Sequence, residues 1–265
     1  MNLLLPGMYV AADSTLHRLD PRVKMGAALL LMVLPFAAPG LASTLLISAF
    51  VAAIAILSAA PPSALLRTLR TIFWLGCFMF AFRLFTTPGQ PLVALGEVVV
   101  TREGLLAGVV QVYRLCLLVI VASLLSFTTS PAQLAHGLEA LLEPLARVGL
   151  PVRELAMVLT IALRFVPVFF AEIEKIAKAQ QARGAGLHAR RPWRRLRNWV
   201  PVFVPIFVTA FRRADELATA MEARGFRGAR RRTRLIELHL TRHDLLAALV
   251  VLAVAAGTWT LEHLM

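Results

Sequence analysis

Residues 104–127, GLLAGVVQVYRLCLLVIVASLLSF, are long and apolar enough to cross a lipid bilayer as one helix. Four more stretches share this apolar composition: residues 24–38, 41–60, 71–86 and 245–264, of which the first and third are short for a span. Hydrophobic residues make up 58% of the chain and charged residues only 16%, whereas a soluble domain carries roughly 25% charged residues. The sequence therefore predicts an all-α integral membrane protein whose bundle has about five spans.

The basic residues gather in one region, and this predicts the orientation in the membrane. Of the 28 Lys and Arg residues, 20 lie between Thr128 and His243. Because Lys and Arg in short loops mark the cytoplasmic side, we expect this region in the cytoplasm, together with the amino terminus and its Arg18, Arg22 and Lys24. The expected organisation is a four-span membrane bundle in residues 1–127, a cytoplasmic helical region in residues 128–243 and a last span in residues 244–265.

Two long helices are expected in the basic region, ending near Ala182 and Arg224. Each begins with an apolar half, continues with a charged half and ends in the same tripeptide: Ala182-Arg183-Gly184 and Ala223-Arg224-Gly225. Gly is common where a helix stops, and Arg suits the negative end of the helix dipole, so either tripeptide alone indicates an ordinary C-cap. Their repetition indicates two guanidinium groups offered to a partner. We expect the helices to pack together and to present both tips to one docking surface.

The sequence contains few of the motifs that are typical of catalytic or metal-binding sites. The predicted spans contain no Asp or Glu before Glu262, and the chain has no Gly-rich phosphate loop and no nucleophile elbow. His239 and His243 have the spacing of two helical metal ligands, but no carboxylate is placed between them as a general base. We therefore expect no catalytic residues and no metal site in this chain.

A basic and aromatic connector precedes the second long helix. Residues 190–197, RRPWRRLR, combine five arginines with Trp193, and Trp199 follows closely. Arginines next to tryptophan suit a membrane surface with anionic headgroups, so membrane lipids are the expected partner here rather than nucleic acid.

The chain contains DSTLHRLDPRVK at residues 13–24, TIALRFVP at 160–167, QQARG at 180–184 and AMEARGF at 220–226. In this order, the four motifs resemble those of the transmembrane T components of energy-coupling factor (ECF) transporters. The resemblance covers essentially the whole chain. One departure is Val10-Ala11-Ala12 before the first motif, where Pro-Gly is commoner in that family.

The resemblance implies the scaffold of an ABC-type vitamin or metal-ion importer in a prokaryotic cell membrane, an L-shaped protein whose long cytoplasmic helices are coupling helices. It implies that two cytosolic ATPase subunits, which bind the ATP and Mg²⁺, dock on the two tips: Ala182, Arg183, Gly184, Ala223, Arg224 and Gly225. The chain itself is expected to bind no cofactor. A membrane-embedded S component, which holds the substrate, is expected to contact the apolar halves of the two long helices: Phe165, Phe169, Phe203 and Phe207.

Two other functions stay open at this point. An integral-membrane lipid-modifying enzyme would use Asp13 and Asp20, although Pro21 and an N-capping role for Asp20 favour a structural interpretation. A permease subunit of an ordinary ABC transporter would bind substrate in its own pore. Such a subunit generally offers one cytoplasmic coupling loop rather than two arginine-tipped helices.

Overall fold

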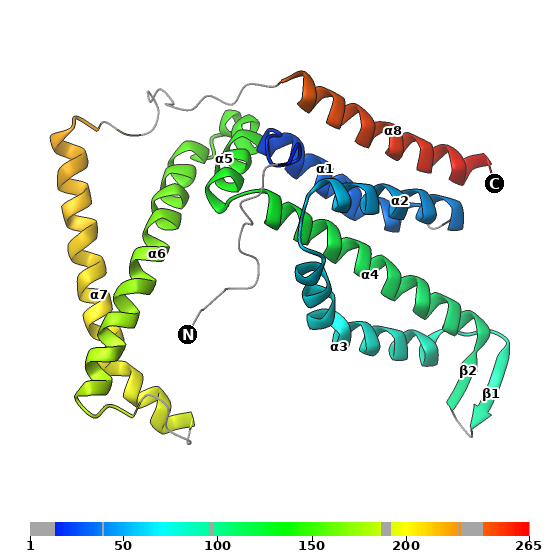
Figure 1. The fold of residues 1–265 in the computed structure, drawn as a ribbon, viewed down its shortest axis with the longest axis horizontal. Coiled ribbons are helices and arrows are strands. Elements are labelled where there is room, and N and C mark those ends of the chain that lie inside the picture. Colours follow the sequence, from blue (N-terminus) through cyan, green and yellow to red (C-terminus); the bar gives the residue numbers. More distant parts are fainter. Residues whose placement is uncertain are drawn as a thin grey trace. The chain divides into compact units, whose positions relative to one another are not determined.

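The computed structural model describes residues 14–38, 40–95, 98–186, 192–226, 228 and 241–264, and they are almost entirely helical. The elements, in chain order, are α1 (Pro21–Ala37), α2 (Leu41–Leu57), α3 (Pro62–Thr86), β1 (Pro91–Leu95), β2 (Val98–Thr101), α4 (Arg102–Thr128), α5 (Pro131–Leu142), the 3₁₀ helix η1 (Glu143–Val148), α6 (Val152–Ala182), α7 (Pro192–Ala223) and α8 (Arg242–Leu264) (Figure 1). The expected helical fold class is confirmed. The short antiparallel hairpin β1–β2 was not expected, although the β-branched run VVVT of β2 favours a strand.

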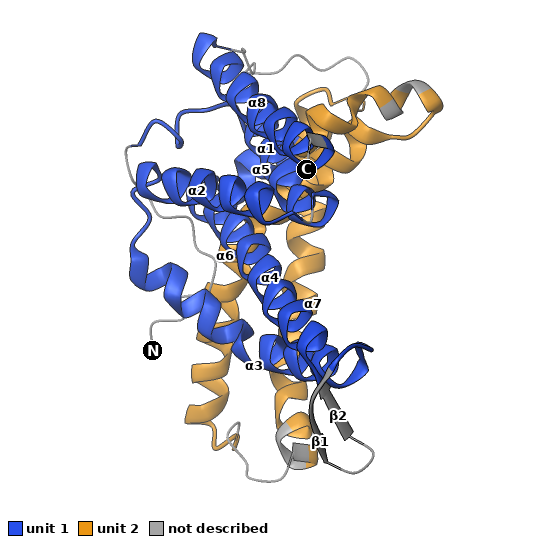
Figure 2. Cartoon of the chain, turned by 90° about the vertical axis from the view of Figure 1, so that its right-hand side faces the viewer, with its two compact units in different colours: residues 1–137, 237–265 blue, residues 138–236 orange. Residues whose placement is uncertain are grey.

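The chain divides into two compact units (Figure 2). Residues 1–137 and 237–265 form the first unit, and residues 138–236 form the second. This division rests on packing, whereas the boundaries expected from the sequence concern membrane and cytoplasmic location. Those boundaries therefore stay a prediction.

Four described helices have the length and composition to cross a membrane: α3, α4, α6 and α8. Helices α1 and α2 coincide with the first two expected stretches but have only 17 residues each. Helix α6 was expected to belong to the cytoplasmic region. In its amino-terminal half, however, residues 155–170 are all apolar except Thr160 and Arg164. The set of spanning candidates thus differs from the expected one, because α6 enters it and the two short helices do not.

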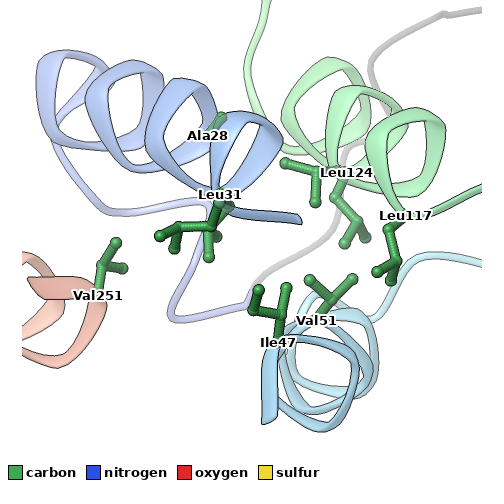
Figure 3. Packing of buried hydrophobic residues seen from close by; sticks show 9 residues of the cluster. Ala28, Leu31, Ile47, Val51, Leu117, Leu124 and Val251 are labelled. Carbon is green, nitrogen blue, oxygen red and sulfur yellow. The ribbon is translucent and has the colours of Figure 1, made fainter. Parts of the chain in front are cut away.

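The core of the first unit is formed by four helices. Buried aliphatic side chains of α1, α2, α4 and α8 meet there (Figure 3): Ala28, Leu31, Leu34, Ile47, Val51, Leu117, Val121, Leu124 and Val251. In lipid, apolar side chains gain little from leaving the solvent, so helices associate through close packing and polar contacts. The polar contacts at the helix ends therefore carry much of the specificity of this bundle.

Helix α8 supplies a carboxylate to the start of two other helices. At one end, the Oδ1 atom of Asp244 accepts a hydrogen bond of 2.7 Å from the N–H of Asp20, the N-cap of α1. At the other end, the Oε2 atom of Glu262 accepts a 3.0 Å bond from the N–H of Gly40, the N-cap of α2. Helix N-termini carry unpaired N–H groups and a positive partial charge, which carboxylates satisfy. The last helix is thereby fixed at both ends.

Two buried side chains of the first unit, Asp244 and Lys24, make further hydrogen bonds near the start of α1. Asp244 is 1% exposed, and its Oδ2 atom also accepts from the backbone and hydroxyl of Thr241, at 2.8 and 2.6 Å. Lys24 is buried as well, and its Nζ atom donates to the carbonyl oxygens of His17 and Thr128, both at 3.1 Å. The lysine thus links the turn before α1 to the carboxyl end of α4, where a cation is favourable.

Glycines bring α3 and α4 close together. A Cβ atom on Gly104 would lie 2.9 Å from the carbonyl oxygen of Leu84, and one on Gly108 would lie 2.9 Å from the ring of Phe80. The spacing Gly-x-x-x-Gly places both glycines on one face of α4, as in close-packed membrane helices. No larger residue fits there unless the helices move apart.

We expect Gly104→Ala to destabilise the protein by roughly 1–3 kcal/mol, because the new methyl group would press against backbone of α3. The matched control is Gly26→Ala in α1, where a Cβ atom meets nothing within 4 Å and alanine favours the helix by up to about 1 kcal/mol. Thermal unfolding in detergent checks this pair. Equal melting temperatures for the two variants would contradict the close approach of α3 and α4.

We expect Asp244→Asn to cost roughly 1–3 kcal/mol of stability, because the amide can no longer accept hydrogen bonds at both of its side-chain atoms and a buried N–H loses its partner. Asp215→Asn is the control, since Asp215 is an exposed carboxylate on α7. Chemical unfolding of both variants in detergent measures the difference. A loss as large in the control would show that charge alone, and not capping, is responsible.

Candidate docking tips and apolar faces

The second unit is built around the antiparallel pair α6 and α7 (Figures 1 and 2). Near the end of α6, the side-chain amide of Gln180 lies 3.4 Å from the carbonyl oxygen of Pro201 in α7. From this level α7 continues to Arg224, a rise of roughly 35 Å at 1.5 Å per residue. The two arginine tips therefore lie at opposite ends of the pair.

The expectation that both tips face one docking surface stays a prediction, but the structure places the tips at opposite ends of the pair, and the sequence contains the reason. Only eight residues connect Arg183 to Pro192, and an extended chain of this length reaches roughly 30 Å. A parallel arrangement would need a connection as long as α6 itself, about 45 Å. The length of the connector thus forces α7 to run back along α6, which separates the tips.

The tip of α6 is a Schellman motif. Arg183 is the C-cap, and Gly184 has a left-handed φ of 87°. The N–H of Gly184 donates to the carbonyl of Gln181 at 2.9 Å, and that of Ala185 donates to Gln180 at 3.0 Å. These two bonds satisfy carbonyl groups that a helix end leaves unpaired.

The tip of α7 repeats this geometry. Gly225 has a φ of 75°, its N–H donates to Glu222 at 2.9 Å, and the N–H of Phe226 donates to Met221 at 3.0 Å. A Cβ atom on either tip glycine would meet nothing within 4 Å, so glycine is needed there for the backbone conformation rather than for space. Arg183 and Arg224 consequently occupy the same position of the same motif.

Both tips are open to a partner. Their six residues are exposed: Ala182, Arg183, Gly184, Ala223, Arg224 and Gly225. Within the described part of the chain, neither tip guanidinium makes a hydrogen bond or an ion pair. Each therefore keeps all of its donors for a binding partner.

The charged half of α6 contains an ion pair between two of its own side chains. Lys178 and Glu174 form an ion pair of 2.8 Å one turn apart, as their spacing predicts, and both are well exposed. An exposed pair of this kind contributes little to stability. This ion pair does not involve Arg183, the tip arginine of the same helix.

The four phenylalanines expected to contact an S component differ in exposure. Phe165 and Phe169 of α6 are half-buried and lie one turn apart, with ring centroids separated by 5.9 Å. Phe203 and Phe207 of α7 are 47% and 62% exposed. Val202 is fully buried, and Phe203 and Phe207 lie about 100° and 140° away from it around α7. The outer side of α7 is thus the larger exposed apolar face.

The residues of the enzymatic alternative take structural positions or lie outside the described residues. The carboxylate of Asp20 accepts from the N–H of Arg22 at 2.8 Å as an N-cap, and the residue is buried. Asp13 and His239 lie outside the described residues. Among the residues that the structure describes, no group of three His, Cys, Asp or Glu side chains could hold a metal ion.

The first unit contains a hollow of about 460 Å³ at the surface of α3 and α4. It is lined by Phe78, Met79, Phe82, Arg83 and Gln111 and is open rather than enclosed. Its lining is apolar apart from one arginine and one amide. A hollow of this shape offers little of what a substrate site needs, namely enclosure and several convergent polar groups.

Known proteins are similar to this chain over nearly its whole length. Residues 12–235 match the family model described as cobalt transport protein, CbiQ. The energy-coupling factor transporter transmembrane protein EcfT of Acidaminococcus fermentans is 42% identical over 93% of this chain and 92% of its own length. The EcfT proteins of Thermosediminibacter oceani and Bacillus subtilis are 42% and 38% identical, over 95% and 96% of this chain and 95% and 97% of their own lengths.

The family model and these relatives cover nearly the whole chain, including both arginine tips. Candidate spanning helices and two arginine-tipped helices agree with that assignment. The chain therefore belongs to the family of transmembrane T components and is the membrane-embedded energy-coupling component of an ECF transporter.

Proposed function

We propose that the chain is the scaffold through which two cytosolic ATPase subunits drive a membrane-embedded S component in the uptake of a vitamin or metal ion. The observation that carries this proposal is the pair of identical, exposed arginine tips at opposite ends of α6 and α7. Two equivalent tips, held roughly 35 Å apart, suit two separate subunits better than a single groove. ATP and Mg²⁺ are bound by the ATPases, and the chain contributes no nucleotide site of its own.

Each tip engages an acidic groove of one ATPase subunit. A guanidinium group presents a planar fork of donors that matches a carboxylate in two parallel hydrogen bonds. The Schellman turn after each arginine fixes the backbone on which the side chain stands. The tip is therefore pre-organised for docking, which lowers the entropy lost on binding.

The helices transmit the movement of the ATPases. In α6 and α7 alike, the tip lies at the carboxyl end and the apolar half lies toward the amino end. Closure of the ATPase pair displaces the tips, and each helix carries its own apolar half along. The S component rests on these halves through Phe165, Phe169, Phe203 and Phe207, and it moves with them.

The tips lie on the cytoplasmic side of a prokaryotic cell membrane, as does the amino terminus. The support for this orientation is the charge distribution, since 20 of the 28 basic residues lie between Thr128 and His243. Cytosolic ATPases reach the tips only in this orientation.

We expect Arg183→Glu or Arg224→Glu to weaken assembly with the ATPase pair by roughly 2–5 kcal/mol and to stop transport, because a desolvated charge pair becomes a repulsion. Arg→Lys at either site should do milder harm, because lysine cannot form the paired hydrogen bonds. Co-purification of the ATPases and substrate uptake in cells measure both effects.

The control for this prediction is Lys178→Glu, which makes the same charge change on the exposed charged half of α6. It should leave assembly near the wild-type level. If the double variant Arg183→Glu plus Arg224→Glu still assembles and transports normally, the arginines are ordinary C-cap residues.

We expect Phe169→Asp or Phe203→Asp to abolish capture of the S component, because a carboxylate in the apolar face has no partner there. ATPase binding should persist, since neither substitution changes a tip residue. Pull-down of both partners with the same variants tests this. Val148→Asp, at an apolar residue of η1 that is 84% exposed, is the control. Loss of both partners together would indicate misfolding and would remove the support for a contact at these rings.

A further inference from the structure

Helix α7 carries one continuous, exposed apolar stripe along its first six turns. Its large members recur every three or four residues, and each is exposed: Trp193, Leu196, Val200, Phe203, Phe207 and Phe211. Trp193 is the most exposed of the six, at 79%. Four of these six residues lie outside the set expected to contact the S component.

The opposite side of α7 is the one that packs within the second unit. Fully buried Val202 lies about half a turn away from the stripe. On the same side, the amide of Asn198 donates to the carbonyl of Gly186, next to the tip of α6, at 2.7 Å. The stripe therefore faces outward, and the packing of the second unit leaves it uncovered.

The charge around the stripe is of one sign. Residues 192–214 contain five arginines and no acidic residue, and three of the arginines, at positions 194, 195 and 197, fall in the first two turns. Positive charge at the start of a helix opposes its dipole, so these arginines do not serve the stability of the isolated helix. Arg197 borders the stripe, and an apolar stripe with a cation beside it is complementary to an anionic surface that also has an apolar layer.

The composition of α7 indicates that it lies at the membrane surface and does not cross the bilayer. Unlike α6 and α8, helix α7 is not among the helices that are apolar enough to cross a bilayer. A helix with one apolar side, one charged side and basic residues lies in the plane of the membrane interface. Tryptophan is favoured at the same depth, near the lipid headgroups.

We propose that the first turns of α7, Trp193 to Val200, are an interfacial anchor for a bilayer that contains anionic phospholipids. Trp193, Leu196 and Val200 insert below the headgroups, and Arg197, which borders the stripe, contacts the phosphates. The anchor goes beyond the ATPase and S-component roles proposed above and depends on neither. It holds the docking end of α6 and the start of α7 at the membrane surface.

The test places a nitroxide label at residue 196 of the full-length protein. Cys77 and Cys116 are first replaced by alanine, and Leu196→Cys or the control Thr219→Cys, on the exposed charged half of α7, is then introduced. The protein is reconstituted in vesicles of phosphatidylcholine, with or without phosphatidylglycerol. Accessibility of the label to oxygen, which concentrates in lipid, and to a water-soluble nickel chelate is then measured.

The anchor predicts that in phosphatidylglycerol vesicles the label at residue 196 is reached by oxygen, whereas the label at residue 219 is reached by nickel. Arg197→Glu should lower the membrane-immersed fraction of the 196 label at least about fivefold in those vesicles and have little effect without phosphatidylglycerol. ATPase co-purification should be unchanged in the Leu196→Cys and Arg197→Glu variants. A failed anchor is thus distinguishable from failed docking.

Three results would overturn the anchor. The label at residue 196 could be as accessible to nickel as the one at residue 219 in both kinds of vesicle. It could be immersed equally with and without phosphatidylglycerol and respond to Arg197→Glu in neither, which would make the contact purely apolar. It could also be shielded from both reagents only when an S component is added, which would assign the surface to that protein.

Discussion

Unpaired backbone groups at helix ends constrain this chain more than its apolar side chains do. Lipid offers no hydrogen bonds, so every buried helix end needs a partner from the protein itself. The first unit meets this need with two carboxylates of α8, Asp244 at the start of α1 and Glu262 at the start of α2. Lys24 does the same for the carbonyl end of α4. The arrangement of the bundle follows from these contacts and from the glycine-lined approach of α3 and α4.

In the second unit, by contrast, the side chains at the ends of α6 and α7 are exposed. The Schellman turns of α6 and α7 satisfy the backbone, so Arg183 and Arg224 are not needed internally. The antiparallel course of the two helices then separates two equivalent binding groups along one rigid pair. In the proposed function, this separation lets the chain connect two ATPase subunits, and the apolar faces of the same helices contact the membrane partner.

Local patterns allowed the sequence to predict local features. Asp20 before Pro21 predicts an N-cap, and Arg-Gly predicts a helix end, and the structure contains both. The contact of Asp244 with Asp20 joins residues 224 positions apart, and no local pattern encodes it. The antiparallel course of α6 and α7 was not predicted, although the eight residues between Arg183 and Pro192 are too few for a parallel arrangement. Helix α6 was not expected among the candidate spans, because its charged half lies in the same helix as its apolar half.

The central claim is that the two tips bind two different ATPase subunits. The most direct measurement introduces a photo-crosslinking amino acid at Ala182, at Ala223 or at both, next to the tip arginines, in the assembled complex. The account predicts that each single variant crosslinks to one ATPase subunit and that the double variant yields a product of this chain with two ATPase subunits. A double variant that crosslinks only one ATPase subunit, reached from both positions, would contradict it.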